Sequence, residues 1–216
     1  MVEDFGQRLR DSAVIAIMRA RSSDQLLDAA EALRAGGVTA IEVTLTTPGS
    51  LDVIRAAIQR FEGRVLFGAG TVLDPESARA AILAGAQFVV APSLHVGTIE
   101  MCRRYSVPVM PGAFTPTEIV AAWQAGADYV KVFPASLGGP GLIKAIRGPL
   151  PQVRLVPVGG VDLTNTAEFV RAGADVVGVG GELVSQQLLD ARDFATITEI
   201  AGRFRAEVEA GRAARG

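Results

Sequence analysis

One phrase recurs four times along this chain and limits the folds open to it more than any other feature. Each copy has Ala-Gly followed at once by a β-rich apolar run, at residues 35–43, 84–92, 125–134 and 172–180. Glycine just past a helix is an expected stop signal, because it adopts positive φ at little cost. The successive glycines lie 49, 41 and 47 residues apart, about two strand–helix units each. The repeat therefore indicates alternating helices and strands.

Apolar runs between these repeats supply the remaining strands. The eight expected strands span residues 14–19, 38–45, 64–69, 87–91, 107–111, 128–133, 153–158 and 175–179. Strands that alternate with helices pair in parallel, and eight such units close naturally into a barrel. An open doubly wound sheet is the alternative, but no Gly-x-Gly-x-x-Gly fingerprint follows the first strand. The sequence therefore predicts an α/β fold, a single (β/α)8 TIM barrel over residues 1–216.

Several helix starts are marked by a capping residue followed by proline. The segment Thr115–Glu118 has the form of a capping box with proline at the first helical position. Asp74-Pro75 and Thr47-Pro48 show the same order of cap and proline. Each of the three is therefore expected to begin a helix.

Charge and composition exclude several classes of function. The formal net charge is −2, so electrostatics give no support for binding nucleic acid or an anionic membrane. No stretch of about 18 apolar residues is present, and the acidic start does not have the form of a signal peptide. We therefore expect a cytoplasmic protein with no nucleic-acid partner and no membrane span.

The chain has one cysteine, Cys102, and one histidine, His95. A catalytic thiol needs a basic partner, and His95 is the only histidine available. We interpret Cys102 as a small buried residue on a helix, and His95 as a surface or helix-start residue.

Side-chain alternation along the sixth expected strand points a lysine into the barrel. Val130 and Val132 suit the side that faces the helices, so Tyr129, Lys131 and Phe133 face inward. By the same rule, Glu42, Thr44 and Thr46 of the second strand face inward. A lysine and a glutamate in one core are costly unless they are paired or functional. A buried ion pair that only fixes register is the alternative to a functional pair.

The rarity of lysine favours a chemical role for Lys131. Of the 21 basic residues, only Lys131 and Lys144 are lysines. Arginine makes the better buried ion pair, but it cannot lose a proton and attack a carbonyl. Imine chemistry needs a neutral amine, and apolar surroundings lower the pKa of a lysine. Lys144 lies near a helix end, where a cation is ordinary.

Glycine pairs follow the last two expected strands. Gly159-Gly160 and Gly180-Gly181 stand where (β/α)8 barrels commonly bind phosphate through backbone N–H groups. Tight turns are the alternative explanation for either pair taken alone. Two such turns on adjacent strands favour an anion site.

From about Arg19 to Val184 the chain resembles the class I aldolases that cleave 2-keto-3-deoxy-6-phosphogluconate (KDPG) or 4-hydroxy-2-oxoglutarate (KHG). The motifs that support this resemblance occur in the family's order. They are Ile41–Leu45, Gly68–Leu73, Pro111-Gly112 with Thr115–Glu118, Val130–Ala135 and Gly159–Val161.

The resemblance implies a role for each candidate residue. Lys131 would form the Schiff base with pyruvate, and Glu42 would transfer protons. The expected substrate-binding residues are Arg19, Thr46, Thr71, Pro92 and Phe133, and the expected phosphate-binding residues are Gly159, Gly160, Gly180 and Gly181. Many relatives have arginine where Thr46 stands, and serine where Gly181 stands. The resemblance further implies a homotrimer that acts on small 2-keto acids and needs no metal and no cofactor beyond the covalent imine.

Two other functions remain open at this point. A phosphate-binding barrel isomerase or epimerase would have the same glycine pairs, but it needs opposed acid and base groups and often a metal. A non-catalytic oligomeric barrel that binds an anion is compatible with the same fold.

Overall fold

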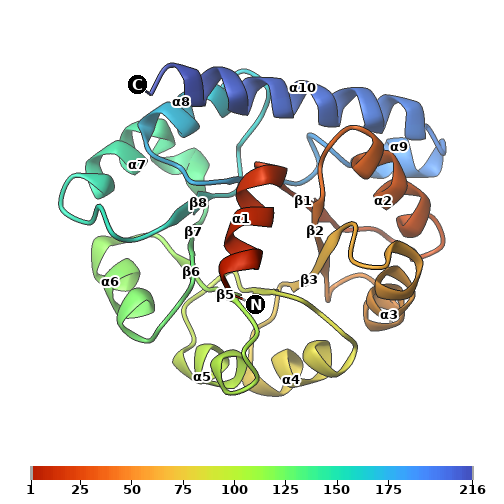
Figure 1. The fold of residues 1–216 in the computed structure, drawn as a ribbon, viewed down its shortest axis with the longest axis horizontal. Coiled ribbons are helices and arrows are strands. Elements are labelled where there is room, and N and C mark those ends of the chain that lie inside the picture. The colour runs from red at the N-terminus through yellow and green to blue at the C-terminus, as the bar shows by residue number, and fades with distance from the viewer. Residues whose placement is uncertain (1, 216) are drawn as a thin grey trace.

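The computed structural model describes residues 2–215, which form an inner ring of strands within an outer ring of helices (Figure 1). The strands are β1 Val14–Met18, β2 Ala40–Thr44, β3 Leu66–Gly70, β4 Val89–Val90, β5 Val109–Met110, β6 Gly112–Ala113, β7 Val130–Val132, β8 Leu155–Pro157 and β9 Val177–Val179. The helices are α1 Val2–Ser12, α2 Leu26–Ala35, α3 Ser50–Phe61, α4 Pro75–Leu83, α5 Val96–Arg104, α6 Pro116–Gln124, α7 Gly139–Arg147, α8 Thr166–Ala172, α9 Gln186–Asp190 and α10 Phe194–Ala213, with a 3₁₀ turn at Ala135–Leu137.

The strands pair in parallel and close on themselves. One sheet has the order β5-β4-β3-β2-β1-β9 and the other has the order β6-β7-β8. Between the two sheets, a parallel bridge joins Val158 to Gly178. β5 and β6 are two halves of one barrel strand, because Pro111 between them has no N–H to donate while its carbonyl accepts from the Lys131 N–H at 3.0 Å. The predicted (β/α)8 barrel is therefore confirmed, and the fifth strand extends past its predicted end at Pro111.

The recurring Ala-Gly phrase has a structural explanation. One glycine in each copy adopts positive φ, from 88° at Gly37 to 121° at Gly173, whereas Gly36 of the first copy has a φ of −77°. In three copies, the side chain that opens the new strand accepts a hydrogen bond of 2.9 Å from a backbone N–H of the preceding strand: Gln87 from Phe67, Asp128 from Val109, and Asp175 from Leu155. These hydrogen bonds fix the stagger between neighbouring strands, so the phrase sets the fold and not the chemistry.

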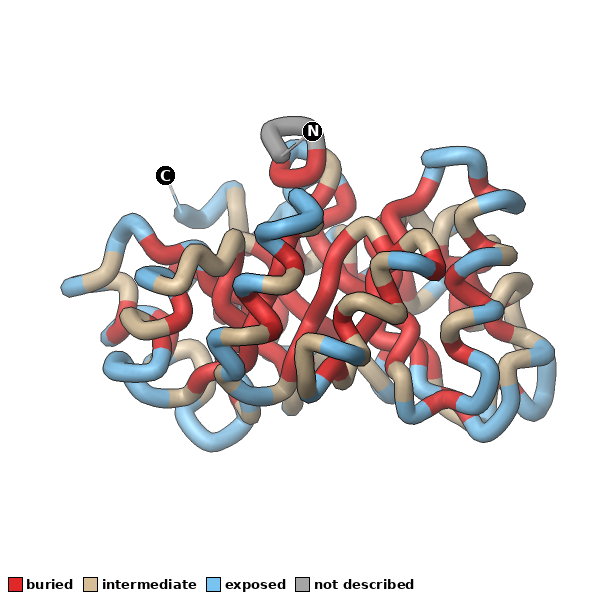
Figure 2. Tube along the Cα trace, turned by 90° about the horizontal axis from the view of Figure 1, so that it is seen from below, coloured by how far each residue is buried: buried red, intermediate tan, exposed pale blue. Residues whose placement is uncertain are grey.

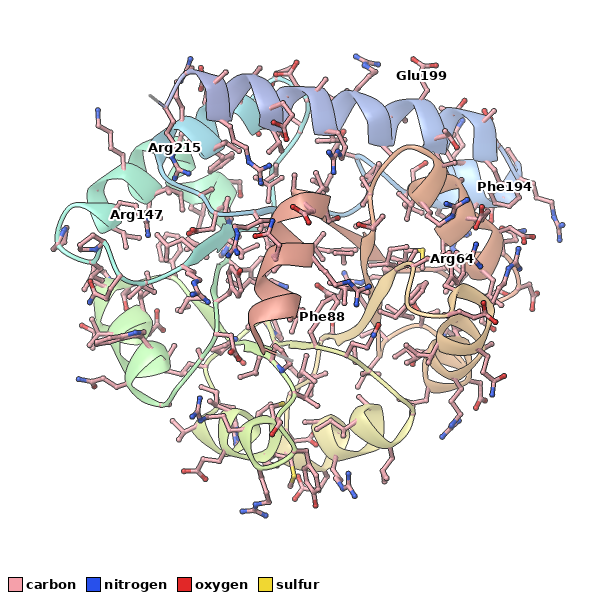
Figure 3. All side chains as sticks on the ribbon, viewed as in Figure 1. Arg64, Phe88, Arg147, Phe194, Glu199 and Arg215 are labelled. Atoms are coloured by element: carbon pink, nitrogen blue, oxygen red, sulfur yellow. The ribbon has the colours of Figure 1, made fainter. Side chains whose placement is uncertain are left out.

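A helix that the sequence did not reveal covers the amino-terminal end of the barrel. α1 lies across the centre of the ring (Figure 1), and the Phe5 ring packs on Phe88 and Tyr129 at centroid distances of 5.8 and 6.3 Å. Phe88 lies at the centre of the ring in Figure 3. Buried residues concentrate along the strands, and exposed residues lie on the outer helices and loops (Figure 2). This end of the barrel is therefore filled and closed.

Two of the three predicted helix starts are confirmed. Thr115 and Glu118 form the reciprocal capping box at α6, and Asp74 accepts from the Ser77 N–H at the start of α4. The third is wrong: α3 begins at Ser50, after Gly49 with φ 69°. The Thr47 hydroxyl instead accepts a hydrogen bond from the Ala20 N–H, on a neighbouring loop.

Candidate active site

The carboxyl ends of the strands surround a cavity of about 520 Å³. Its lining includes ten of the eleven residues that the sequence singled out: Arg19, Glu42, Thr71, Pro92, Lys131, Phe133, Gly159, Gly160, Gly180 and Gly181. Such cavities are where (β/α)8 enzymes carry out their chemistry. The structure therefore brings nearly all the candidates together at one site.

Lys131 lies at the base of this cavity. It is the middle residue of β7 and is only 6% exposed, which confirms that it points into the barrel. The buried Tyr129 precedes Lys131 on the inner face of β7. The Lys131 Nζ lies 5.1 Å from the centroid of the Phe133 ring. The amine is thus held against apolar and aromatic surface inside the cavity.

Glu42 enters the same cavity from β2. It is 2% exposed, and Oε1 has no hydrogen-bond partner in the described part of the chain. Burial raises the pKa of the Glu42 carboxyl, and the charges of Lys131 and Arg19 oppose that rise. A carboxyl with a raised pKa exchanges its proton nearer neutrality, so Glu42 is suited to acid–base work.

Gly70 leaves space for the Glu42 carboxyl, a role that the sequence analysis did not assign to Gly70. A Cβ at position 70 would overlap the Glu42 carboxylate. In the sequence, Gly70 is visible only as part of the glycine-containing strand end Gly68-Ala69-Gly70. Its real function is to leave room for a side chain from the neighbouring strand.

Thr71 follows Gly70 with a strained backbone. Its φ is 57°, a left-handed conformation that a β-branched residue rarely adopts. Two barrel strands away, Gly112 lies so close to the Pro92 carbonyl that a Cβ at position 112 would collide with it. Strain and close backbone contact at one cavity are features that functional sites concentrate.

The glycine pairs form the other end of the cavity. Gly159 and Gly160 both have φ of 83°, and a Cβ at Gly160 would collide with Ser136. Gly180 and Gly181 have open space around their Cα atoms. Glu182, which the sequence interpretation missed, follows directly and lines the same cavity. The end expected to hold phosphate therefore has backbone N–H groups and one carboxylate, and the cationic side chains that line the same cavity are Arg19 and Lys131.

Thr46 is the one candidate that does not line the main cavity. β2 ends at Thr44, and the turn that follows carries Thr46 to the surface, where its hydroxyl donates to Thr44 Oγ1 at 3.1 Å. It lines an adjoining pocket together with Arg19, Ala20, Arg21, Pro48 and Gln186. Arg19 and Gln186 border both spaces.

The remaining chemical candidates have structural roles. His95 caps α5, where Nδ1 accepts from the Thr98 N–H at 3.1 Å. Cys102 is buried, and burial raises the pKa of its thiol to about 12. Over residues 2–215, no three His, Cys, Asp or Glu side chains gather as a metal site, and no helix is long and apolar enough to cross a membrane.

Fold and cavity place the chain among the (β/α)8-barrel enzymes that hold a lysine and a carboxylate at the carboxyl ends of their strands. Comparisons with known proteins narrow that class. A family model described as KDPG and KHG aldolase matches residues 5–200. The chain belongs to this family of aldolases.

Individual relatives agree over most of their length. A 2-dehydro-3-deoxy-phosphogluconate aldolase of Treponema pallidum is 40% identical over 196 residues, 90% of this chain and 91% of the relative. A 2-dehydro-3-deoxy-6-phosphogalactonate aldolase of Escherichia coli K12 is 37% identical over 171 residues, 79% of this chain and 83% of the relative. A structure of KDPG aldolase from Legionella pneumophila, with pyruvate captured as a covalent carbinolamine intermediate, has a TM-score of 0.85 and 31% identity over 91% of this chain and 96% of that one.

Proposed function

We propose that the chain is a Schiff-base aldolase acting through Lys131. It cleaves KDPG to pyruvate and glyceraldehyde 3-phosphate, or KHG to pyruvate and glyoxylate, or both. The observation that carries the proposal is the presence of two buried residues, Lys131 with its amine and Glu42 with its carboxyl, in one cavity. Membership of the aldolase family supports the same assignment.

The reaction begins when the neutral Lys131 amine attacks the C2 ketone of the 2-keto acid. With one proton taken from solvent, the carbinolamine loses water and becomes a protonated imine, which withdraws electrons; the final hydrolysis returns that proton. Glu42, directly or through a water, takes the proton of the C4 hydroxyl. The C3–C4 bond then breaks, its electron pair moves to the imine nitrogen to form an enamine, and the aldehyde departs.

The second half of the reaction returns the enzyme to its starting state. Glu42 donates its proton to C3 of the enamine, and water hydrolyses the resulting imine to release pyruvate and the free amine. Because Glu42 accepts one proton and returns one, it ends as it began. The imine itself provides the electron sink, so the proposed mechanism requires neither a metal nor a further cofactor.

The other candidates are assigned by their position around the cavity. Thr71, Pro92 and Phe133 would contact the pyruvyl half next to Lys131, and Arg19 would bind an anionic group of the substrate. Backbone N–H groups at Gly159, Gly160, Gly180 and Gly181 would bind the distal phosphate or hydroxyl. Thr46 would contribute only from the adjoining pocket.

Trapping with borohydride tests the proposal directly. Wild-type protein incubated with pyruvate and sodium borohydride is expected to gain the mass of one reduced pyruvyl group, located by peptide mapping at Lys131. Lys131→Arg should show no adduct and no cleavage activity. Lys144→Arg is the matched control, and it should keep both. An adduct at another residue, no adduct, or an active Lys131→Arg variant would contradict the mechanism. The absence of both an adduct and cleavage activity in the wild type would favour a barrel that only binds anions.

The proposal extends to assembly and compartment. A homotrimer in the cytoplasm is the expected form. Exposed apolar side chains, among them Leu83, Trp123 and Leu137 at 66, 43 and 74% exposure, are available to a subunit interface. Sedimentation of the purified protein measures its mass, and a monomer would contradict the trimer.

A further inference from the structure

The turn that follows β1 carries Arg19 and is held from two sides. The Ala20 N–H donates to Thr47 Oγ1, and the Arg21 N–H donates to Gln186 Oε1, each at 3.1 Å. The two backbone donors directly after Arg19 are therefore both bound by side chains from other elements. We call this pair of hydrogen bonds the Arg19 clamp.

The Gln186 half of the clamp is built from the far end of the chain. Gln186 begins α9, 165 residues after Arg21, and it borders both the main cavity and the adjoining pocket. Its amide Nε2 donates to Asp190 Oδ1 at 2.7 Å, which fixes the orientation of the amide group. Gln186 thus presents its oxygen to the Arg21 N–H in one defined way.

The Thr47 half is buried and linked to the strand that holds Glu42. Thr47 is 1% exposed, and its hydroxyl lies 3.3 Å from Thr44 Oγ1. Thr44 is the second residue after Glu42 on the inner face of β2. The clamp therefore ties the position of the Arg19 turn to the strand that supplies the carboxylate.

Arg19 depends on this backbone support. The Arg19 side chain is exposed at the cavity rim, and among the side chains that the structure describes, those of residues 5–215, no carboxylate lies within ion-pair distance of it. A long side chain without a partner loses much rotamer freedom when it binds a ligand. Holding its backbone in advance reduces the number of conformations that binding must exclude.

We infer that Thr47 and Gln186 are positioning residues that hold Arg19 ready for the anionic group of the substrate. This inference rests on the proposed aldolase function, because Arg19 acts there as the cation that binds the substrate.

The electrostatics of the cavity supply a readout that reports on Arg19. The charged groups that act on Glu42 are Lys131 from β7 and Arg19 from the end of β1, and both lower its pKa. If the clamp is broken and Arg19 moves away, the pKa of the Glu42 carboxyl rises further. The acid limb of kcat/KM then shifts to higher pH, a change that a general loss of stability does not produce.

Gln186→Leu removes the surface half of the clamp. We expect KM for the 2-keto acid to rise about three- to tenfold, as the loss of one hydrogen bond typically gives, with a smaller change in kcat and the acid limb at higher pH. Gln187→Leu, one residue away and exposed, is the matched control and should match the wild type. An unchanged KM and pH profile in Gln186→Leu would overturn its assignment.

Thr47→Val and Thr47→Ser separate positioning from packing. Valine keeps the shape but leaves the Ala20 N–H without an acceptor, whereas serine keeps the oxygen. We expect valine to raise KM and serine to restore it. If Thr47→Val lowers the folding yield, Thr47→Ser still tests the inference. A KM raised as much in Thr47→Ser as in Thr47→Val would contradict the role assigned to this hydrogen bond.

The Arg19→Ala background tests whether both residues act through Arg19. Adding Gln186→Leu to Arg19→Ala should cost nothing further in KM, whereas independent effects would add. Full additivity would overturn the inference. Borohydride trapping on the same proteins separates failure of this inference from failure of the proposed function. An adduct in the wild type together with additive KM effects would reject only the positioning role of Thr47 and Gln186. No adduct in the wild type would reject the aldolase mechanism and this inference together.

Discussion

The two ends of this barrel are built from the same strands but have opposite chemistry. At the amino ends, Phe5, Phe88 and Tyr129 fill the interior and α1 covers it. At the carboxyl ends, Glu42 and Lys131 face an open cavity. Burying ionisable groups lowers stability unless other contacts offset the cost. The filled end provides apolar burial that does not need to accommodate a substrate, so the reactive end is free to hold poorly paired groups.

After the loss of activity expected in Lys131→Arg, the largest effect is expected from Glu42→Gln at the open end. Loss of the proton carrier should lower kcat about 10²- to 10⁴-fold, the usual share of general acid–base catalysis. Because burial raises the pKa of the Glu42 carboxyl, the folded state binds that proton more tightly than the unfolded state does. The free energy of unfolding therefore falls as the pH rises above the ordinary glutamate pKa of about 4.3.

Glu42→Gln should consequently be more stable than wild type at neutral pH while being far less active. Urea denaturation at pH 4 and pH 7 measures this, and the stability gain should be larger at pH 7. If Glu42→Gln is instead less stable than the wild type at pH 7, the Glu42 carboxylate is better paired than the structure indicates. The difference in electrostatic cost between the two ends of the barrel would then be smaller than proposed.

Phe5→Ala tests the filled end. Removing a ring that packs on Phe88 and Tyr129 should lower the free energy of unfolding by about 3 kcal/mol. The kcat of the folded fraction should stay close to that of wild type, because the change lies at the far end of the strands. Chemical denaturation and activity assays at low temperature give the two numbers. A large fall in kcat with unchanged stability in Phe5→Ala would contradict the proposal that this end contributes stability and the other end contributes catalysis.

The smallest effect is expected from Glu182→Gln at the glycine end of the cavity. The carboxylate opposes a phosphate bound to the neighbouring N–H groups, so its removal should tighten binding of inorganic phosphate about three- to fivefold at low salt. The difference should shrink in high salt.

Titration calorimetry with inorganic phosphate measures the effect of Glu182→Gln. Glu199→Gln is the control, since Glu199 lies on the outer side of α10 (Figure 3). Equal phosphate affinity in both variants and wild type would place the anion site elsewhere.

Local patterns in the sequence predict the fold of this molecule and the two central residues of its candidate active site. The repeated Ala-Gly phrase marks where helices end and strands begin. Side-chain alternation places Lys131 and Glu42 inside, because both lie within strands where that rule holds. It fails for Thr46, because β2 ends two residues earlier and the turn carries the side chain outward.

What the sequence does not reveal depends on contacts between distant segments. Gln186 supports Arg19 only because α9 returns to the end of β1. Gly70 matters because a carboxylate from another strand occupies the space beside it. α1 contributes Phe5 and Leu9 at a spacing of four, a pattern too short to predict a helix that closes a barrel.

The link between the first and last helices bears on how the chain matures during synthesis. Arg212 of α10 donates to the Arg10 carbonyl of α1 at 2.7 Å, and Arg205 donates to the Ser12 carbonyl of α1 at 3.3 Å. A nascent chain lacks these donors until α10, which supplies them from 202 residues beyond Arg10, has been synthesised. α1, although made long before α10, is therefore secured by these hydrogen bonds only late in synthesis, after the strands between the two helices have been made.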